Sequence, residues 1–284
     1  MIWDFAAILT LLVFVSGIIW ACDSLLFAPA RIRAAKDEAE ARAGKEAEAK
    51  ATAAPATPQA VLFEPPQLPW LVDYARSFFP IFLVVLLLRS FVVEPFRIPS
   101  GSMIPTLLIG DFILVNKFDY GIRLPVLNRK VIELGQPKRG DVVVFRYPLD
   151  PSTPFIKRIV GLPGDTVRYA DKALYINDQL ADSVPEGIYV GVRSATSSTG
   201  AMMFKEHLGD VDHNILLTPG AGSPNGEFQV PAGHYFVLGD NRDNSRDSRY
   251  WGYVPDQNLV GRAFFIWMNW DSGPALKRIG SIIH

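Results

Sequence analysis

The sequence predicts a mainly β protein, in which an antiparallel, sheet-like or barrel-like domain is anchored by two N-terminal membrane-spanning helices. Three observations lead to this prediction. Two long apolar runs lie within the first hundred residues, a charged and proline-rich segment separates them, and short strand-like stretches broken by turn-forming residues make up the remainder. With 284 residues, 49% of them hydrophobic, the chain is long enough for one sizeable folded core beside the anchor.

The first apolar run extends from Phe5 to Cys22 and contains no charged residue. Its eighteen residues have the length of a membrane-spanning helix, so we expect residues 1–28 to form a first transmembrane segment. A cleavable signal ending near Cys22, as at a lipoprotein processing site, is the alternative. Asp4 precedes the run and no lysine or arginine does, which disfavours this alternative because signal peptides begin with a positive charge.

Residues 29–70 differ in character from the run before them. The stretch "RIRAAKDEAEARAGKEAEAK" is alanine-rich with interleaved charges, and "PATPQAVLFEPPQLP" is rich in proline. This pattern favours a solvated helix followed by an extended linker, a connector without a site of its own. Basic residues gather here while none precedes the first apolar run, so the positive-inside rule predicts a cytoplasmic loop.

The second apolar run, "FFPIFLVVLLLRSFVVEPF", is interrupted only by Arg89 and Glu94. It predicts a second transmembrane segment over residues 71–94, although its uncharged part alone would also suit a buried helix. Arg89 lies near one end, where a long side chain can reach the lipid headgroups. Two crossings would then place everything after this run on the outer side of the membrane.

Residues 95–284 are expected to form the β domain. Seven stretches are rich in β-branched and aromatic residues and are bounded by Gly, Pro, Asn or Asp: "FILVNK", "DVVVFRY", "FIKRIV", "TVRYA", "ALYIN", "HYFVLGD" and "GRAFFIWM". Residues 171–233 are richer in Gly and Ser and predict an inserted subdomain. Trp251, Trp267 and Trp270 suit either a membrane interface or the core.

Composition argues against several classes of partner. The net charge of −1 gives no electrostatic reason to expect nucleic acid. A single cysteine, Cys22, excludes an internal disulfide, and the four histidines show no metal-ligand spacing. The polar segment starting at Asp240 fails as a calcium loop because Arg242 stands where an Asp or Asn ligand is needed. We therefore expect no metal and no cofactor, and a histidine base remains only a minor alternative.

Ser100 and Ser102 flank Gly101 in a segment bounded by Pro99 and Pro105. Prolines make such a segment stiff and glycine allows close approach of another backbone, which suits a serine nucleophile. A plain turn where a helix leaves the membrane would have the same composition.

The second candidate is Lys157 in "PFIKRIVGLPGD". In a strand, alternation puts Lys157 and Arg158 on opposite faces. A lysine amine becomes a usable base only when desolvation lowers its pKa from about 10.4, whereas a guanidinium does not deprotonate at all. An outward-facing lysine without a role is the alternative for this position.

Four blocks then occur in a characteristic order after the two apolar runs: "PSGSMIPTLLIGD" at 99–111, "RGDVVVF" at 139–145, "FIKRIVGLPGD" at 155–165 and "GDNRDNSRDSRYWG" at 239–252. Together they resemble the bacterial type I signal peptidases, or leader peptidases, a family of membrane serine endopeptidases with a Ser/Lys dyad. The resemblance implies cleavage of N-terminal signal peptides from exported preproteins after small-x-small sites.

The resemblance also implies roles for individual residues. Ser102 would be the nucleophile and Lys157 its general base, while Ser100 and the backbone N–H of Ser102 would bind the oxyanion. Ser245 would orient the lysine, and Asp247 and Arg249 would support the site structurally. The implied substrate pocket is lined by Ile98, Pro99, Met103, Phe155 and Ile156.

The family further implies a place in the bacterial inner membrane, with the catalytic domain on the periplasmic side, and preprotein signal peptides and membrane lipid as partners of a monomer. Residues 171–233 lack the cysteine pair that some members carry in this region, so the shape of the subdomain stays open. Two other interpretations remain. One is a self-cleaving or regulatory Ser/Lys protease, which would carry a DNA-binding module, and the other is a non-catalytic, membrane-tethered β domain that binds exported chains.

Overall fold

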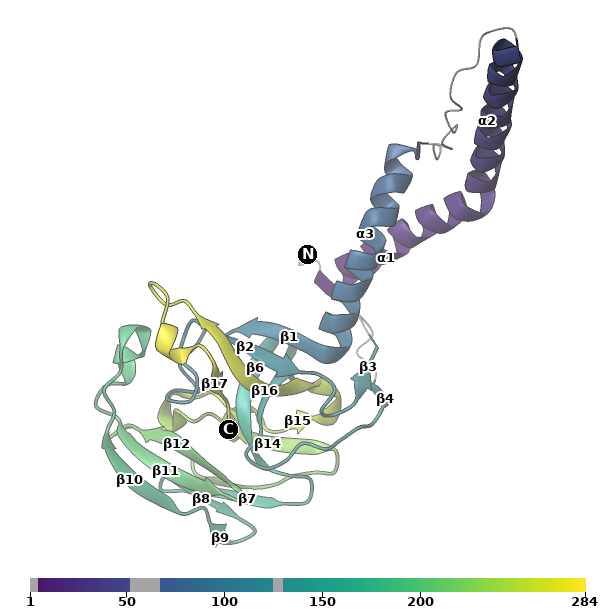
Figure 1. Cartoon of the computed structure of the whole chain (residues 1–284). Helices are drawn as coiled ribbons and strands as arrows, with labels where there is room; N and C mark the ends of the chain where they lie inside the picture. The colour runs from purple at the N-terminus through teal and green to yellow at the C-terminus, as the bar shows by residue number, and fades with distance from the viewer. Residues whose placement is uncertain (1–4, 52–66, 125–129) are drawn as a thin grey trace. The chain divides into compact units, whose positions relative to one another are not determined.

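The computed structural model describes residues 5–51, 67–124 and 130–284. The chain divides into two compact units, residues 1–87 and residues 88–284 (Figure 1). The first unit is helical, and the second is built almost entirely of strands.

The helical unit contains a long helical run and a second helix beside it. The run consists of α1 (Phe5–Cys22), the π-helical turn η1 (Asp23–Phe27) and α2 (Ala28–Ala51), and the second helix is α3 (Trp70–Leu87). α1 packs on α3, where Gly17 lets the helices approach, since an added Cβ would lie 2.9 Å from the Phe79 ring. Asp23 and Arg31 form a bidentate ion pair with both contacts at 2.6 Å.

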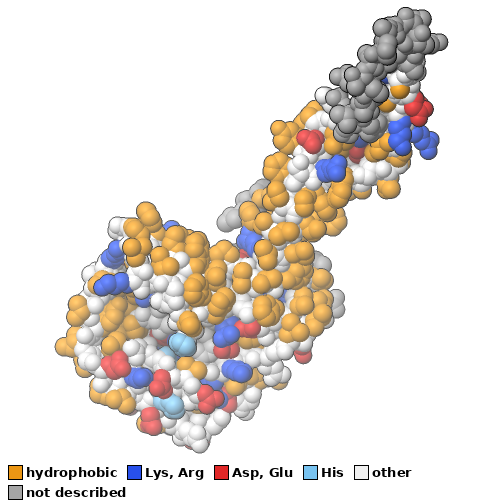
Figure 2. Space-filling model, in the orientation of Figure 1, with side chains coloured by type: hydrophobic (Ala, Val, Ile, Leu, Met, Phe, Trp, Pro, Cys, Tyr) orange, Lys and Arg blue, Asp and Glu red, His pale blue; other side chains and the backbone are white. Residues whose placement is uncertain are grey.

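Two helical stretches among the described residues, Ala7–Gly44 and Trp70–Val92, are long and apolar enough to cross a membrane. Figure 2 shows that hydrophobic side chains dominate the visible surface of α1 and α3. α2 is helical over much of the segment predicted to connect the two runs. The predicted proline-rich linker lies largely outside the described residues.

The second unit is organised around an antiparallel sheet with eight strands in the described part of the chain. It begins after the π-helical turn η2 (Leu88–Val92). In spatial order its strands are β1 (Val93–Arg97), β2 (Asp111–Asn116), β16 (Leu259–Asn269), β5 (Val142–Tyr147), β6 (Asp150–Gly161), β14 (His234–Leu238) and β15 (Val254–Pro255), with β17 (Ser281–Ile282) paired to β16.

Smaller antiparallel sheets and short helices complete this unit. The small sheets are β10 (Ser183–Ile188), β11 (Met202–Leu208) and β12 (Val211–Leu217), then β13 (Gly226–Gln229), β7 (Thr166–Ala170), β8 (Ala173–Ile176) and β9 (Gln179–Leu180), then β3 (Ile122–Arg123) and β4 (Lys130–Ile132). The short helices are η3 (Arg193–Ser198), η4 (Arg242–Asn244), α4 (Ser248–Trp251), η5 (Asp256–Asn258) and η6 (Leu276–Arg278).

The predicted fold class is confirmed: the β unit is antiparallel, and two apolar helices precede it. Each of the seven predicted strand-like stretches contains a strand. β7 lies before the predicted insertion at 171–233 but pairs with β8 and β13 inside it. The helical structure of the second run ends at Val92, and Glu94 already belongs to β1.

The strands bury both faces of the large sheet near its centre. On β6 the residues from Ile156 to Gly161 are all buried, and the facing β5 is buried from Val142 to Phe145. Separate apolar clusters lie around these strands. As a result, any polar side chain in the middle of β6 is removed from water on whichever face it lies.

Candidate active site

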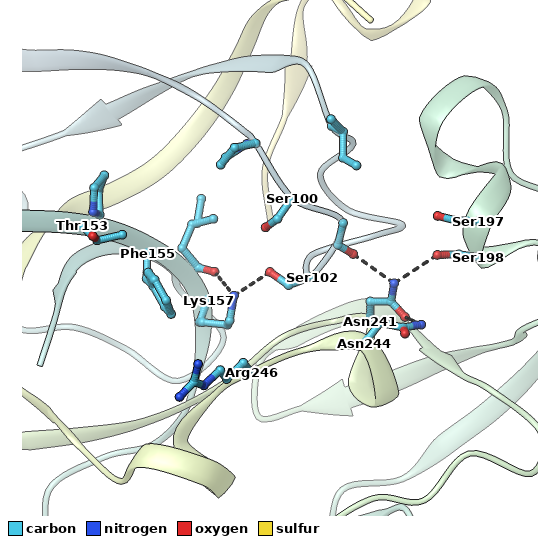
Figure 3. A pocket seen from close by; sticks show the side chains of 15 residues that line it. Ser100, Ser102, Thr153, Phe155, Lys157, Ser197, Ser198, Asn241, Asn244 and Arg246 are labelled. Carbon is cyan, nitrogen blue, oxygen red and sulfur yellow. Dashed lines mark hydrogen bonds between the residues drawn. The ribbon is translucent and has the colours of Figure 1, made fainter. Parts of the chain in front are cut away.

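Ser102 and Lys157 meet although 55 residues separate them in sequence. The Lys157 Nζ lies 2.6 Å from the Ser102 Oγ and donates to the Ile156 carbonyl oxygen at 2.8 Å (Figure 3). The exposed fraction of Lys157 is 4% and that of Ser102 is 8%. The two predicted residues are thus in hydrogen-bonding contact and shielded from water.

The loop that carries Ser102 is closed by backbone hydrogen bonds and anchored by apolar side chains. The Ile98 N–H donates to the Asp111 carbonyl oxygen at 2.8 Å, and the Gly110 N–H donates to the Ile98 carbonyl oxygen at 2.9 Å. Met103, next to the serine, is completely buried in the apolar core. The neighbouring residue therefore fixes Ser102 from inside while the hydroxyl points to Lys157.

Burial makes the Lys157 amine unusually weakly basic. Desolvation lowers its pKa to about 8, and the more distant carboxylates of Asp247 and Asp240 oppose this shift only in part. Among the described residues no carboxylate forms an ion pair with Nζ. At pH 7 about one lysine in ten is then neutral, far more than for an exposed lysine.

Arg158 lies on the other face of β6 and has the partners that Lys157 lacks. Its Nε and Nη2 donate to the two oxygens of Asp240 at 2.9 and 2.8 Å. Its Nη1 donates to the carbonyl oxygens of Gly140 and His284, each at 2.7 Å. Strand alternation predicted opposite faces for Lys157 and Arg158, and the structure shows that both faces are buried.

A cavity of about 540 Å³ opens beside Ser102 and Lys157. Ser100, an exposed residue, lines it two positions before Ser102. The Ser102 N–H donates no hydrogen bond within the described part of the chain. A hydroxyl and a free backbone N–H near the nucleophile can together stabilise an oxyanion.

The residues predicted to line a substrate pocket fall into two groups. Pro99, Phe155 and Ile156 line the cavity. Ile98 and Met103 do not line it, because their side chains are 2% and 0% exposed and lie in the apolar core with Ile156. The part of the cavity lining formed by Ile156 is consequently supported from behind by tightly packed apolar side chains.

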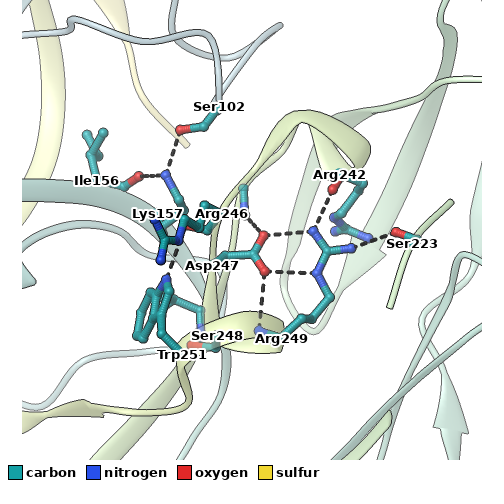
Figure 4. A network of polar contacts seen from close by, with 12 residues as sticks. Ser102, Ile156, Lys157, Ser223, Arg242, Arg246, Asp247, Ser248, Arg249 and Trp251 are labelled. Carbon is teal, nitrogen blue, oxygen red and sulfur yellow. Dashed lines mark hydrogen bonds and ion pairs between the residues drawn. The ribbon is translucent and has the colours of Figure 1, made fainter. Parts of the chain in front are cut away.

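The segment 239–252 forms a buried polar network, shown in Figure 4. Asp247 accepts hydrogen bonds from the Gly239 N–H at 3.1 Å and from the Arg249 Nε and Nη2, each at 2.8 Å. The Arg249 Nη1 donates to the Ser223 Oγ at 3.0 Å. The Ser245 hydroxyl is buried and makes no hydrogen bond with the described residues, so the predicted contact with Lys157 is not formed in this structure.

Two residues that the sequence analysis passed over hold the nucleophile segment. The Asn241 N–H donates to the Ser102 carbonyl oxygen at 3.1 Å, and its Nδ2 donates to the Gly101 carbonyl oxygen at 3.0 Å. At Gly239 an added Cβ would lie 2.5 Å from the Ser102 carbonyl oxygen and 2.2 Å from the Ser245 Oγ. Both residues belong to the "GDNRDN" block, but spacing alone does not show what they contact.

The histidines do not join this site. In the described structure no histidine contacts Ser102: His207 bonds Asp212, the His234 ring is near the Ala232 carbonyl oxygen, and His213 lies in the interior with its Nε2 3.3 Å from Glu206. No cluster of three or more His, Cys, Asp or Glu residues suited to a metal ion occurs among the described residues.

Comparison with known proteins adds to this geometry. The family model described as "Signal peptidase, peptidase S26" matches residues 71–270. A signal peptidase I from Pseudomonas fluorescens is 48% identical over 98% of this chain and 99% of its own length, and one from Pseudomonas aeruginosa is 46% identical over 99% of both. The solved structure of a signal peptidase I from Enterococcus faecalis is 35% identical, with a TM-score of 0.29, and covers 46% of this chain and 98% of its own.

Proposed function

Because this chain belongs to the signal peptidase family, peptidase S26, we propose that it removes signal peptides from exported preproteins with Ser102 as its nucleophile. Membership of this family makes the chain a serine protease that hydrolyses peptide bonds in preproteins. The observation that carries the residue assignment is the 2.6 Å contact between the Lys157 Nζ and the Ser102 Oγ.

In the proposed mechanism the neutral Lys157 amine takes the proton from the Ser102 hydroxyl as its oxygen attacks the scissile carbonyl carbon. The resulting ammonium then gives a proton to the leaving amine, and the C–N bond breaks to leave an acyl-serine. A water molecule attacks this ester while Lys157 again accepts the proton. Hydrolysis releases the signal peptide and restores Ser102 and the neutral amine.

The developing oxyanion would be held by the Ser100 hydroxyl and the Ser102 N–H. Donors of this kind stabilise a transition state by about 2.7–4 kcal/mol each in other hydrolases. Their availability supports this role, because the Ser102 N–H has no other acceptor among the described residues. Ser100 lines the same cavity as Ser102.

Selectivity for small residues before the cut would come from the apolar residues of the cavity lining, Pro99, Phe155 and Ile156. Ile98 and Met103 are buried in the same apolar cluster as Ile156, so this part of the lining is backed by packed side chains. Because a well-packed core resists expansion, a bulky residue at this place would displace the scissile bond from Ser102. This favours small-x-small cleavage sites.

Three residues of the polar segment would support the dyad. Asp247, itself paired with Arg249, accepts a hydrogen bond from the Gly239 N–H, and an added Cβ at Gly239 would collide with the Ser102 carbonyl oxygen. Ser245 has a buried hydroxyl that makes no hydrogen bond with the described residues of the resting structure. We assign it the task of accepting a hydrogen bond from the Lys157 ammonium while the Ser102 oxygen is bonded to the tetrahedral carbon of the substrate.

The membrane anchor would cross the bilayer twice. The segment 29–70 would lie in the cytoplasm, because it is rich in lysine and arginine, and residues 95–284 would lie on the periplasmic side. In this topology Ser102 follows the second span after a short segment, which keeps it close to the membrane surface where signal peptides are presented. This topology needs one copy of the chain and its contact with membrane lipid, so we propose that the protein acts as a monomer.

The test uses the full-length protein in detergent and a preprotein with its signal peptide. Ser102→Ala and Lys157→Ala should each abolish the shortened product in mass spectra, whereas the exposed Ser183→Ala and Lys205→Ala should leave cleavage unchanged. Normal cleavage by Ser102→Ala would overturn the assignment. A wild-type protein that binds the preprotein without shortening it would instead support a non-catalytic binding domain.

A further inference from the structure

The cavity beside Ser102 has two walls of different chemistry. One contains apolar residues, among them Pro99, Phe155 and Ile156. The other contains hydroxyl and amide side chains: Ser197, Ser198, Asn241 and Asn244. Figure 3 shows Ser197 and Ser198 on the far side of Ser102 from Phe155 and Lys157. We call this second side the polar wall.

Part of the polar wall comes from η3, which is firmly attached to a distant loop. The Arg193 guanidinium donates to the carbonyl oxygens of Asp271, Gly273 and Pro274 at 2.7–3.0 Å. The N–H and hydroxyl of Ser194 both donate to the Asp271 carboxylate at 3.0 and 2.6 Å. η3 is therefore held in place before any substrate arrives, which lowers the entropic cost of binding against it.

The inner side of η3 is fixed against the nucleophile segment as well. Ala195 is fully buried in an apolar cluster with Ile104, two residues after Ser102. The Asn241 Nδ2 donates to both the Gly101 carbonyl oxygen and the Ser198 Oγ, at 3.0 and 3.1 Å. The Asn241 side-chain amide thus links the polar wall to the nucleophile segment and fixes their relative position.

The polar wall contains hydrogen-bond donors that no described residue accepts from. Ser198 is 6% exposed and its Oγ accepts a hydrogen bond from Asn241, but it donates none to the described residues. The Asn244 Nδ2 donates one hydrogen bond, to the Asn241 Oδ1, and has a second hydrogen available. An extended polypeptide presents one carbonyl oxygen per residue, and each needs a donor when it leaves water.

We propose that the polar wall is a subsite for the first residues after the cut, with the Ser198 hydroxyl donating to a backbone carbonyl of the mature segment. The inference rests on the proposed function, because the apolar wall then receives the signal peptide and the chain must continue past Ser102 to the opposite side. Short polar side chains in the mature segment of the substrate would match the hydroxyl and amide groups of the polar wall. In this role Ser198 is a positioning residue.

Two substrates with the same residues before the cut separate this role from an indirect one. The first continues for five residues after the scissile bond, and the second ends at the cut as a methyl ester. In full-length protein, Ser198→Ala should lower kcat/KM for the long peptide about fivefold more than for the ester, the loss expected for one hydrogen bond. Ser197→Phe, a substitution at an exposed position, should fill the polar wall and discriminate against the long peptide still more strongly.

The exposed Ser183→Ala is the matched control and should affect neither substrate. Equal losses on the long peptide and the ester would overturn the proposal, because Ser198 would then act on Ser102 through Asn241 alone. The proposal would also be overturned if the ratio of kcat/KM for the long peptide to kcat/KM for the ester were the same as in wild type in both Ser198→Ala and Ser197→Phe. Failure of the proposed function has a different outcome, in which wild type cleaves neither substrate or Ser102→Ala cleaves both.

Discussion

The two faces of β6 carry neighbouring cations in opposite electrostatic settings. Lys157 and Arg158 are 4% and 0% exposed, so water stabilises neither charge. Arg158 has a bidentate carboxylate and two carbonyl acceptors, whereas Lys157 has a hydroxyl and one carbonyl. We refer to these surroundings as the Arg158 face and the Lys157 face.

The Arg158 face continues into a wider ionic network. Asp240 also accepts a hydrogen bond from the Thr106 hydroxyl at 2.5 Å. Burial by itself would raise the pKa of Asp240, but the Arg158 charge and hydrogen bonds outweigh it and hold the pKa below the ordinary value. Glu206 and Arg242 form a second buried ion pair. The His213 ring lies between the two pairs, with its Nε2 3.3 Å from Glu206 and 3.8 Å from Asp240.

The difference between the faces shows how one strand separates structure from chemistry. On the Arg158 face the guanidinium is paired with a carboxylate, and the pair ties β6 to the loop beyond β14. On the Lys157 face a titratable amine is buried with no ion-pair partner among residues 5–51, 67–124 and 130–284, so it loses its proton more readily. The same burial stabilises the fold on one side and, as we propose, activates a base on the other.

The largest expected effect follows from removing the titratable amine. Lys157→Met should lower kcat/KM for preprotein cleavage by at least about 1,000-fold, because general-base catalysis contributes up to about 10,000-fold. The same variant should unfold at a higher temperature near neutral pH, since the buried amine is disfavoured when charged. Single-turnover cleavage assays and thermal unfolding in detergent check the two parts. A destabilised variant would contradict our view of the Lys157 face.

The next effect tests how much the fold depends on the ion pair between Arg158 and Asp240. Asp240→Asn should destabilise the fold by about 3–5 kcal/mol, because it leaves a buried guanidinium without its counterion. The control is Asp212→Asn, whose exposed contacts with His207 and Lys205 should together contribute no more than about 1 kcal/mol. Chemical denaturation of both variants measures the difference. Equal losses would mean that burial does not distinguish the two pairs.

Sequence patterns predicted much of this arrangement. Alternation in "FIKRIV" placed the two cations on opposite faces, and the four blocks linked Ser102 with Lys157 through the family resemblance. Alternation does not show which face is buried, and here both are. The partner of Arg158 is 82 residues away, and Ser198 lies in a segment without a recognisable motif. Such contacts depend on how distant strands and loops pack, which local patterns do not encode.

The assignment of Ile98 and Met103 to the substrate pocket illustrates the same limit. Their apolar character suits a pocket or a core equally well. The structure places both in the core beneath Ile156, because the closed loop between β1 and β2 turns them inward. Only the three-dimensional course of the loop separates residues that line the cavity from those that support it.

The third effect is the pH dependence that the Lys157 face imposes. Since the proposed base is the neutral amine and its pKa is about 8, kcat/KM should rise about 50-fold between pH 6 and pH 8 and level off above pH 9. Stability should change as well. In the unfolded chain Lys157 has the ordinary lysine pKa of about 10.5. The unfolded state therefore binds more protons than the folded state between pH 8 and pH 10.5, and stability rises with pH through this window.

Lys157→Met should remove this rise in stability, which provides the control for other titrating groups. Rates measured from pH 5.5 to 9.5 and unfolding measured from pH 7 to 10.5 cover both windows. A profile centred near pH 6.5 would point to a histidine and contradict the assignment of the base.

The smallest effect concerns Ser245, whose buried hydroxyl has no hydrogen-bond partner in the part of the chain that the structure describes. Ser245→Ala should leave the unfolding temperature unchanged or slightly raised, because it removes a buried polar group that makes no hydrogen bond in the resting structure. It should nevertheless lower kcat about tenfold with little change in KM, since the ammonium formed during turnover would lose its acceptor. An unchanged kcat would show that Ser245 does not orient the lysine, and that the charged amine is stabilised by the Ile156 carbonyl alone.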